Sequence, residues 1–338
     1  MPSEAVLTRK ALVTRERLMN GALVCLLILV PLWAHLNDEP YYLGLATQVV
    51  ILALAGVGLN LALGTGGMIS FGHAAFFGLG GYVAGVAAYH AFDGTPFLSL
   101  GIEIPGTNSL PVIWLLSIAV AGVVALVIGC MSLRTTGVYF IMITLAFAQM
   151  IYYLAVSLPT YGGEDGLPIY LRNELPFFDS SDPLVFFGLS LTFLLCALLL
   201  VHRLTGSRFG AALQVARMNE TRLATVGIPP FPIRLTGFVV SGMITGLAGA
   251  LYADLNGFVG PSMLAWQRSG EIMIFVILGG VGRLFGPVVG AAVFVLLETW
   301  LGEQTHHWQF FLGLILLAVV LFARGGVMGL IAGRARHV

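Results

Sequence analysis

The sequence predicts an all-α integral membrane protein with about eight to ten transmembrane helices, some of them broken at glycines. Three observations carry this prediction. Of the 338 residues, 58% are hydrophobic and only 9% are charged, whereas a soluble domain carries about 25% charged residues. Apolar runs long enough to cross a bilayer recur along the chain, which excludes a soluble domain with a single anchor. The run 56–85 carries no charge yet is rich in glycine.

The individual helices follow from the roughly 20 apolar residues that one crossing requires. The segments 264–282 and 286–302 are short and almost without a loop between them, so the prediction is eight to ten crossings rather than a fixed number. The candidate segments are 18–36, 42–63, 68–90, 111–131, 138–157, 184–202, 233–255, 264–282, 286–302 and 308–323.

The first segment follows a basic stretch, as the apolar part of a signal peptide would. It is long for such a region, and no clear cleavage site follows it, so we interpret it as an uncleaved first transmembrane helix. Cys25, Cys130 and Cys196 lie in separate apolar segments without a CxxC pair. We therefore expect neither a disulfide nor a metal site.

Basic residues predict the orientation, because they accumulate on the cytoplasmic side of membrane proteins. With a cytoplasmic N-terminus and ten crossings, only Arg172 and Arg268 fall outside, and acidic residues such as Glu271 lean outward. This predicts cytoplasmic termini (1–17 and 324–338), external loops at 91–110 and 158–183, and a cytoplasmic loop at 203–232. The basic residues assigned to the cytoplasm are Arg9, Lys10, Arg15, Arg17, Arg134, Arg203, Arg208, Arg217, Arg222, Arg234, Arg283, Arg324, Arg334 and Arg336.

Glycines at 64, 66 and 67 predict a broken helix inside the second apolar region. Broken backbone at membrane depth is tolerated only where it is buried in protein or lines a cavity, so it points to a transport pathway. Tight helix packing explains glycine alone equally well. The polar residues Asn60, Ser70 and His73 in the same stretch favour a pathway. A second glycine-rich break at 279–282 suggests an internal repeat around a central site, although packing glycines explain it almost as well.

Two absences narrow the function. Lys10 is the only lysine, so the chain cannot hold a P-loop, and any ATP that powers transport must bind another subunit. The middles of the predicted spans lack the carboxylates that ion-coupled carriers use. Glu298 lies near a segment end, where an interfacial snorkelling role is the better interpretation. For His73, a packing role and a pathway role are about equally supported.

Residues 208–228 predict a short helix on the cytoplasmic face. Their composition favours helix, while Gly227 and the following prolines would end it. The helix would carry Arg217, Glu220 and Arg222. It could be an ordinary amphipathic surface helix or a rigid docking element for a cytoplasmic motor.

This stretch resembles the EAA-type loop of ABC importer permeases, with Glu220, Ala224 and Gly227 at the family's positions and Thr221 and Arg222 departing from its pattern. Further stretches look like the LivM-type permease of branched-chain amino acid ABC importers, over about residues 42–323. The glycine before the histidine in the second of them is similar to the LivM type rather than the LivH type. These stretches are GLNL at 58–61, SFGHAAF at 70–76, LRTTGVYF at 133–140, TLAFAQ at 144–149, GGEDGL at 162–167 and AGALY at 248–252.

The resemblance implies a permease subunit rather than an enzyme, in a bacterial inner membrane and surrounded by lipid. It implies a second, LivH-like permease, two cytoplasmic ATPases that bind the ATP, and a periplasmic substrate-binding protein. No cofactor on this chain and no nucleic-acid partner are expected. The substrate would be a branched-chain or other hydrophobic amino acid, although relatives that carry urea, amides or aromatic carboxylates keep that choice open.

Two other classes compete with this interpretation. A stand-alone carrier or channel would explain the glycines but not the missing coupling residues. An intramembrane protease would need a Gly-x-Ser-Gly or His-Glu-x-x-His motif, and the chain has neither. We therefore expect one set of residues to line the pathway and another to couple it to the ATPases, although Thr144 and Gln149 could simply bridge helices at about 0.6 kcal/mol per bond. The pathway set is Asn60, Ser70, His73, Thr144 and Gln149, and the coupling set is Arg217, Glu220, Arg222 and Gly227.

Overall fold

The computed structural model describes residues 3–98, 104–170, 173–174, 182–305, 307–322 and 325–332. The sequence-predicted loops 91–110 and 158–183 and the tail 324–338 are therefore described only in part. Arg172, Arg324, Arg334 and Arg336 lie outside the described residues.

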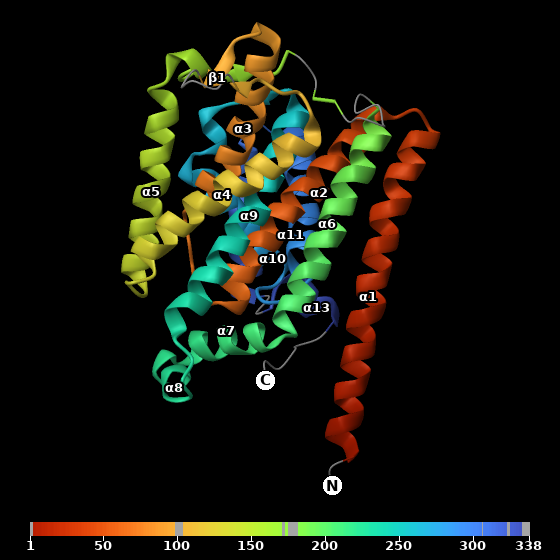
Figure 1. Cartoon of the computed structure of the whole chain (residues 1–338). Coiled ribbons are helices and arrows are strands. Elements are labelled where there is room, and N and C mark those ends of the chain that lie inside the picture. The colour runs from red at the N-terminus through yellow and green to blue at the C-terminus, as the bar shows by residue number, and fades with distance from the viewer. Residues whose placement is uncertain are drawn as a thin grey trace.

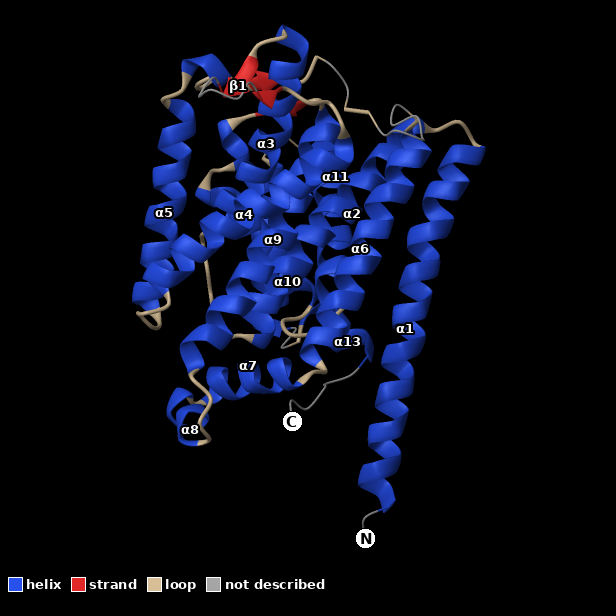
Figure 2. Cartoon of the chain, viewed as in Figure 1, coloured by secondary structure: helices blue, strands red, loops and turns tan. Residues whose placement is uncertain are grey.

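A bundle of long helices forms the molecule (Figures 1 and 2), which confirms the all-α prediction. Among the described residues, seven helices are long and apolar enough to cross a membrane, namely α2, with its continuation to Thr65, α3, α4, α5, α6, α9 and α11. The segments Asn20–Leu36 and Trp308–Val319 are shorter apolar helices. The long elements are α1 (Ser3–Leu36), α2 (Pro40–Asn60), α3 (His73–Asp93), α4 (Leu110–Ser132), α5 (Val138–Val156), α6 (Pro183–Thr205), α9 (Pro230–Asn256), α11 (Gly286–Gln304) and α12 (Trp308–Phe322).

Glycines bring the central helices into backbone contact. A Cβ atom added at Gly80 of α3 would overlap the carbonyl of Gly246 on α9, and one added at Gly249 would overlap the carbonyl of Phe77. Small residues allow this approach, which increases van der Waals contact between membrane helices. The packing explanation of the glycines is thus correct for these positions in α3 and α9.

The bundle has two chemically different ends, which we name by their elements. The α7 end carries α7 (Arg208–Met218), α8 (Glu220–Thr225) and α13 (Gly326–Ala332), and α1 begins there too (Figure 1). The strand end carries β1 (Pro96–Leu98) paired with β2 (Ile104–Pro105), and β3 (Leu167–Pro168) paired with β4 (Phe258–Val259), both antiparallel.

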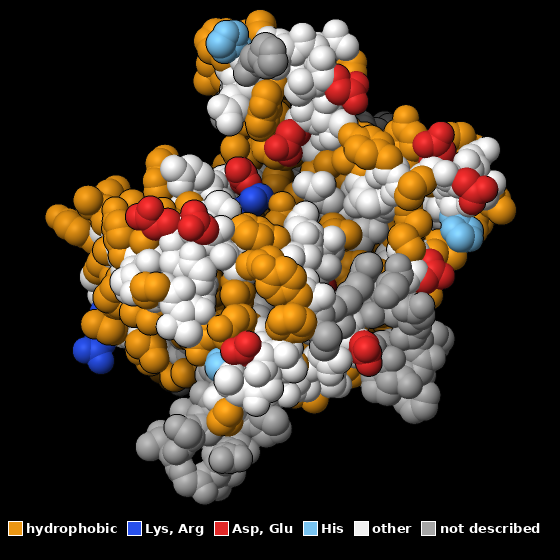
Figure 3. Space-filling model, turned by 90° about the horizontal axis from the view of Figure 1, so that it is seen from above, with side chains coloured by type: hydrophobic (Ala, Val, Ile, Leu, Met, Phe, Trp, Pro, Cys, Tyr) orange, Lys and Arg blue, Asp and Glu red, His pale blue; other side chains and the backbone are white. Residues whose placement is uncertain are grey.

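Charge separates between these ends as the sequence predicts. Arg203, Arg208, Arg222 and Arg234 lie in or next to α7 and α8, or in the first turns of α9, at the α7 end, and Arg134 lies in the turn between α4 and α5. Acidic side chains predominate on the strand end, which Figure 3 shows from above. The two ends of the described chain lie at the same end of the bundle, as an even number of crossings requires.

One predicted crossing is built differently. The sequence predicts that the segment 264–282 crosses as a helix, but α10 (Trp266–Gly279) has only 14 residues, or about 21 Å, too short for a hydrocarbon core of about 30 Å. The chain instead re-enters the bundle from the strand end through β4 and a 3-10 turn at Pro261–Met263. This irregular backbone is buried along α3, where Val259 faces Gly85 and Leu264 faces Gly78. Hydropathy counts apolar residues and cannot distinguish this path from a straight helix.

Candidate functional site at the broken helix

The predicted helix break is present between α2 and α3. The α2 helix continues as one π-helical turn, Leu61–Thr65, and the chain is non-helical from 66 to 72 before α3 begins at His73. Gly67 has φ +66°, a conformation that a residue with a Cβ rarely adopts. The break therefore needs glycine for its backbone and not only for packing.

The break reaches the middle of the bundle. His73 Nε2 lies 2.7 Å from Ser241 Oγ, and Ser241 is close to the midpoint of the 27-residue helix α9. Ser241 Oγ donates to the Gly58 carbonyl at 2.6 Å, so the imidazole must donate to Ser241 from Nε2. Among the described residues His73 Nδ1 has no hydrogen-bond partner, and the ring is fully buried against Phe76 and Phe238.

Side chains from two other helices hold the non-helical backbone. On α5, Thr144 Oγ1 accepts from the Phe71 amide at 3.3 Å. On α10, Ser269 Oγ donates to the Phe71 carbonyl and accepts from the Ala74 amide, both at 2.7 Å. Ser70 Oγ accepts from the Gly72 amide at 3.1 Å. Phe71 is thus fixed by α5 and α10 at once, which satisfies backbone groups that could not be left unpaired at this depth.

Sequence reasoning missed Ser269. It is fully buried, but its partners Phe71 and Ala74 are almost 200 residues away along the chain. A serine in the first turn of a helix is a common residue, so no local signal distinguishes it.

The two glycine-rich breaks touch each other. Asn60 Nδ2 donates to the Arg283 carbonyl at 2.8 Å, and Asn60 Oδ1 accepts from the Gly282 amide at 2.9 Å. A Cβ at Gly64 would lie 2.7 Å from the Gly282 amide nitrogen. Arg283 is buried and donates to the Met328 carbonyl at 2.9 Å. The sequence suggests a pair of breaks around one centre, and the structure places them in direct contact.

The coupling segment differs from its prediction in one respect. The single helix expected over 208–228 is two helices, α7 and α8, because Asn219 interrupts it. Asn219 Oδ1 accepts from the Arg222 amide at 3.1 Å and caps α8; asparagine is among the residues favoured at such caps. Gly227 ends this region with φ +85°, as the sequence indicates.

Of the four predicted coupling residues, two contact other elements of the bundle and two are exposed. Arg217 Nη1 donates to the Gly64 carbonyl, and its aliphatic stem lies against Gly67. Glu220 forms an ion pair with Arg234 at the start of α9. Arg222 and Gly227 are exposed. Arg217 therefore joins α7 directly to the π-helical turn that precedes the break.

Gln149 lies apart from the other pathway residues, on a polar groove of about 850 Å³ between α5 and α10. The groove also exposes Arg268 and Glu271, which form an ion pair at 2.6 Å. Their predicted place on the outer side of the membrane stays a prediction. They flank Ser269, whose bonds to Phe71 and Ala74 bring the start of α10 down to the depth of the break.

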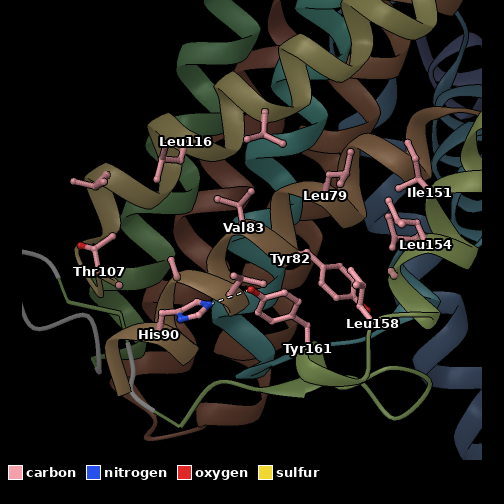
Figure 4. Close-up of a pocket in the computed structure, with 17 residues that line it drawn as sticks. Leu79, Tyr82, Val83, His90, Thr107, Leu116, Ile151, Leu154, Leu158 and Tyr161 are labelled. Atoms are coloured by element: carbon pink, nitrogen blue, oxygen red, sulfur yellow. Dashed lines mark hydrogen bonds between the residues drawn. The ribbon is translucent and has the colours of Figure 1, made fainter. Parts of the chain in front are cut away.

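A second, apolar cavity of about 620 Å³ lies among α3, α4 and α5 (Figure 4). At one end of it His90 Nε2 lies 3.1 Å from Tyr161 Oη. Aliphatic side chains such as Val83 and Leu116 form most of its wall. None of the predicted site residues lines this cavity.

The family described as "Branched-chain amino acid transport system / permease component" matches residues 41–320. The high-affinity branched-chain amino acid transport system permease protein LivM of Escherichia coli K12 is 26% identical over 330 residues, 90% of this chain and 74% of LivM. BraD of Pseudomonas aeruginosa, with the same description, is 24% identical over 82% of this chain and 91% of its own. The autoinducer 2 import system permease protein LsrC of Escherichia coli SMS-3-5 is 28% identical over 50% of this chain and 52% of its own. No solved structure matches the chain significantly.

Proposed function

Since the chain belongs to the family of branched-chain amino acid transport system permease components, we propose that it is the membrane-spanning permease subunit of an ATP-driven importer for branched-chain or other hydrophobic amino acids. It is a multi-pass transport component and not an enzyme. The names of LivM and BraD support the amino acid substrate.

The observation that carries this proposal is the bond from Arg217 to the Gly64 carbonyl. It joins a surface helix to the π-helical turn that precedes the break between α2 and α3. A permease driven by a separate ATPase subunit needs such a rigid connection. The free energy of ATP binding must reach the pathway through contacts that differ between two conformations of the permease. In this proposal α7 and α8 dock on two cytoplasmic ATPases through Glu220, Arg222 and Gly227.

The remaining assembly follows from that role. A second, LivH-like permease completes the translocation pathway, and a periplasmic substrate-binding protein delivers the substrate to the strand end. The α7 end then faces the cytoplasm of a bacterium, which agrees with the excess of arginine there. ATP binds the ATPase subunits and not this chain.

Within this chain the pathway would open at the break. Ser70 and Thr144 hold the segment 66–72 in place, while Asn60 and His73 fix its two flanks. In the proposed mechanism a movement of α7 pulls on Gly64 and releases part of this hydrogen-bonded set. Gln149, on the groove next to the break, would meet substrate first.

The substrate has a second candidate class. LsrC is similar to half of this chain and is described as an autoinducer 2 import system permease protein, so a substrate of that kind is the alternative. Members that carry urea, amides or aromatic carboxylates remain alternatives too. A stand-alone carrier or channel is the less favoured possibility.

Affinity purification of the tagged chain from its own membranes tests the assembly. We expect a second permease and two ATPases with Walker motifs in the purified complex, and less ATPase after Glu220→Arg. Recovery of this chain alone, active in liposomes without ATP, would refute the importer proposal. Uptake of labelled leucine by the reconstituted complex with its binding protein tests the substrate, and failure to transport any hydrophobic amino acid would refute that part.

A further inference from the structure

The polar groove between α5 and α10 is lined by charged side chains that have no role in the transport pathway proposed above. Glu164 and Asp165 border it from the loop after α5, and Arg268 and Glu271 from α10. Tyr152, Tyr153 and Trp266 add aromatic surface. The lining therefore combines one guanidinium, three carboxylates and a set of aromatic rings in a space of about 850 Å³.

Arg268 is held in a defined position. Its guanidinium carbon lies 5.3 Å from the ring centre of Tyr252 and 5.9 Å from that of Phe77, both within the range of cation–π attraction. Glu271 pairs with it at 2.6 Å. The side chain of Arg268 is nevertheless 19% exposed, and that of Glu271 is 36% exposed. Both can therefore contact a small molecule in the groove.

The depth of this pair argues against a merely solvated surface role. Arg268 and Glu271 sit beside Ser269, which bonds the backbone at Phe71 and Ala74 near the middle of the bundle. Charged residues at membrane depth are energetically costly, and those that face a water-filled cavity usually mark a substrate or ion path.

The acidic loop is fixed opposite α10 rather than free. The turn that contains Glu164 and Asp165 is closed by bonds from the Asp165 and Gly166 amides to the Gly162 carbonyl, both at 3.0 Å. Directly after it, β3 pairs with β4, which leads into α10. A Cβ at Gly166 would lie 2.6 Å from the Val259 carbonyl oxygen. The carboxylates and the guanidinium thus face one groove from two connected segments.

We propose that this groove is an entry site for a zwitterionic amino acid, a proposal that rests on the importer function above. Arg268 would bind the α-carboxylate, because a guanidinium matches carboxylate geometry with two parallel donors. Glu164, Asp165 and Glu271 would attract the α-ammonium, and the aromatic rings would contact the hydrophobic side chain. With three carboxylates to one guanidinium, the groove repels simple carboxylate anions and gives a neutral amide or sugar no charge complement.

A thiol-protection assay on the permease–ATPase complex, reconstituted without binding protein, tests this proposal. Ser262 is exposed in the groove, so Ser262→Cys, in a background with Cys25, Cys130 and Cys196 replaced by Ala, reports groove access through its rate of labelling by a neutral maleimide. Thr160→Cys, exposed at the same end but not on the groove lining, is the matched control. We expect leucine to slow labelling of the Ser262→Cys variant only, and 4-methylpentanoate, which lacks the ammonium, to have no effect. Equal protection by both compounds, or protection by neither, overturns the proposal.

Variants separate ligand binding from structural support. Arg268→Gln should raise the half-protecting leucine concentration about tenfold or more, since bonds to charged groups are worth a factor of that order. The double variant Arg268→Gln with Glu271→Gln removes the unpaired carboxylate. Recovery of leucine protection in the double variant would assign Arg268 a structural role and overturn its part in the proposal. Glu164→Gln with Asp165→Asn should let 4-methylpentanoate protect.

Failure of this proposal is distinguishable from failure of the importer proposal. If the complete system imports leucine but leucine never protects the thiol of the Ser262→Cys variant, only the entry site is refuted. If the complete system imports no hydrophobic amino acid, the proposed substrate class is refuted whatever the labelling shows.

Discussion

Removal of the Arg217 guanidinium tests how α7 communicates with the membrane helices. In the structure Arg217 Nη1 donates to the Gly64 carbonyl and its stem lies on Gly67. A hydrogen bond from a charged donor is worth about 1.5–3 kcal/mol. Because Arg217 is exposed overall, we take the lower end, about 1.5 kcal/mol, which corresponds to roughly a tenfold change in an equilibrium constant.

Arg217→Gln should therefore lower the number of substrate molecules transported per ATP hydrolysed. The decrease is up to about tenfold if the bond exists in only one of the two conformations between which the permease alternates. The assay measures leucine uptake and phosphate release together in proteoliposomes that contain the complete importer. Arg208→Gln, on the same helix and also exposed, is the matched control and should leave the ratio unchanged. Arg217→Lys keeps the positive charge and N–H donors at the end of a shorter side chain, so it should recover part of the loss.

Two results would contradict this reasoning. An unchanged transport ratio in Arg217→Gln would mean that the bond to Gly64 carries no coupling. A lower ratio accompanied by loss of ATPase from the purified complex would mean that Arg217 acts in docking and not through the broken helix.

Three further predictions concern single residues. Gly227 has φ +85°, so Gly227→Val should uncouple ATP hydrolysis from transport while the chain still inserts, because such backbone strain costs about 1–3 kcal/mol. Gly227→Asn, a residue that tolerates this φ, should retain coupling. Normal coupled uptake in the Val variant would refute the assignment. Gly80→Ala should lower the detergent-solubilised melting temperature, because its Cβ would overlap the Gly246 carbonyl, whereas Gly188→Ala, with no atom within 4 Å, should not; equal melting of the two variants would disprove the backbone contact. Asn60→Leu leaves two backbone groups of the second break unpaired, which costs about 1–3 kcal/mol for each group. We therefore expect faster proteolysis at 280–285 than in the control variant Thr192→Val, at an exposed position of α6. Equal rates would count against a structural contact between the two breaks.

Local features of the sequence predicted much of the architecture. Composition and the length of apolar runs indicated a multi-pass helical protein, and the arginine distribution indicated that both termini share one end, because both depend on how single side chains partition between water and lipid. The break between α2 and α3 was predictable as well, since glycines in an uncharged run weaken a helix wherever they occur. For the same reason the chain reversal at Gly227, just after α8, was predictable from the residue itself.

The joints of the site were decided by the tertiary structure. Asn60 meets Arg283, Phe71 meets Ser269 and Gly64 meets Arg217 across 223, 198 and 153 residues of sequence. Each bond needs ordinary residue types whose positions are set by helix packing, so no local pattern marks them. The same holds for Arg268 and Glu271, which fall in the predicted span 264–282, because hydropathy alone does not give their depth in the bundle. Their place beside the break follows from the irregular segment 259–264, which is mostly buried and which Gly78 and Gly85 of α3 admit at close range.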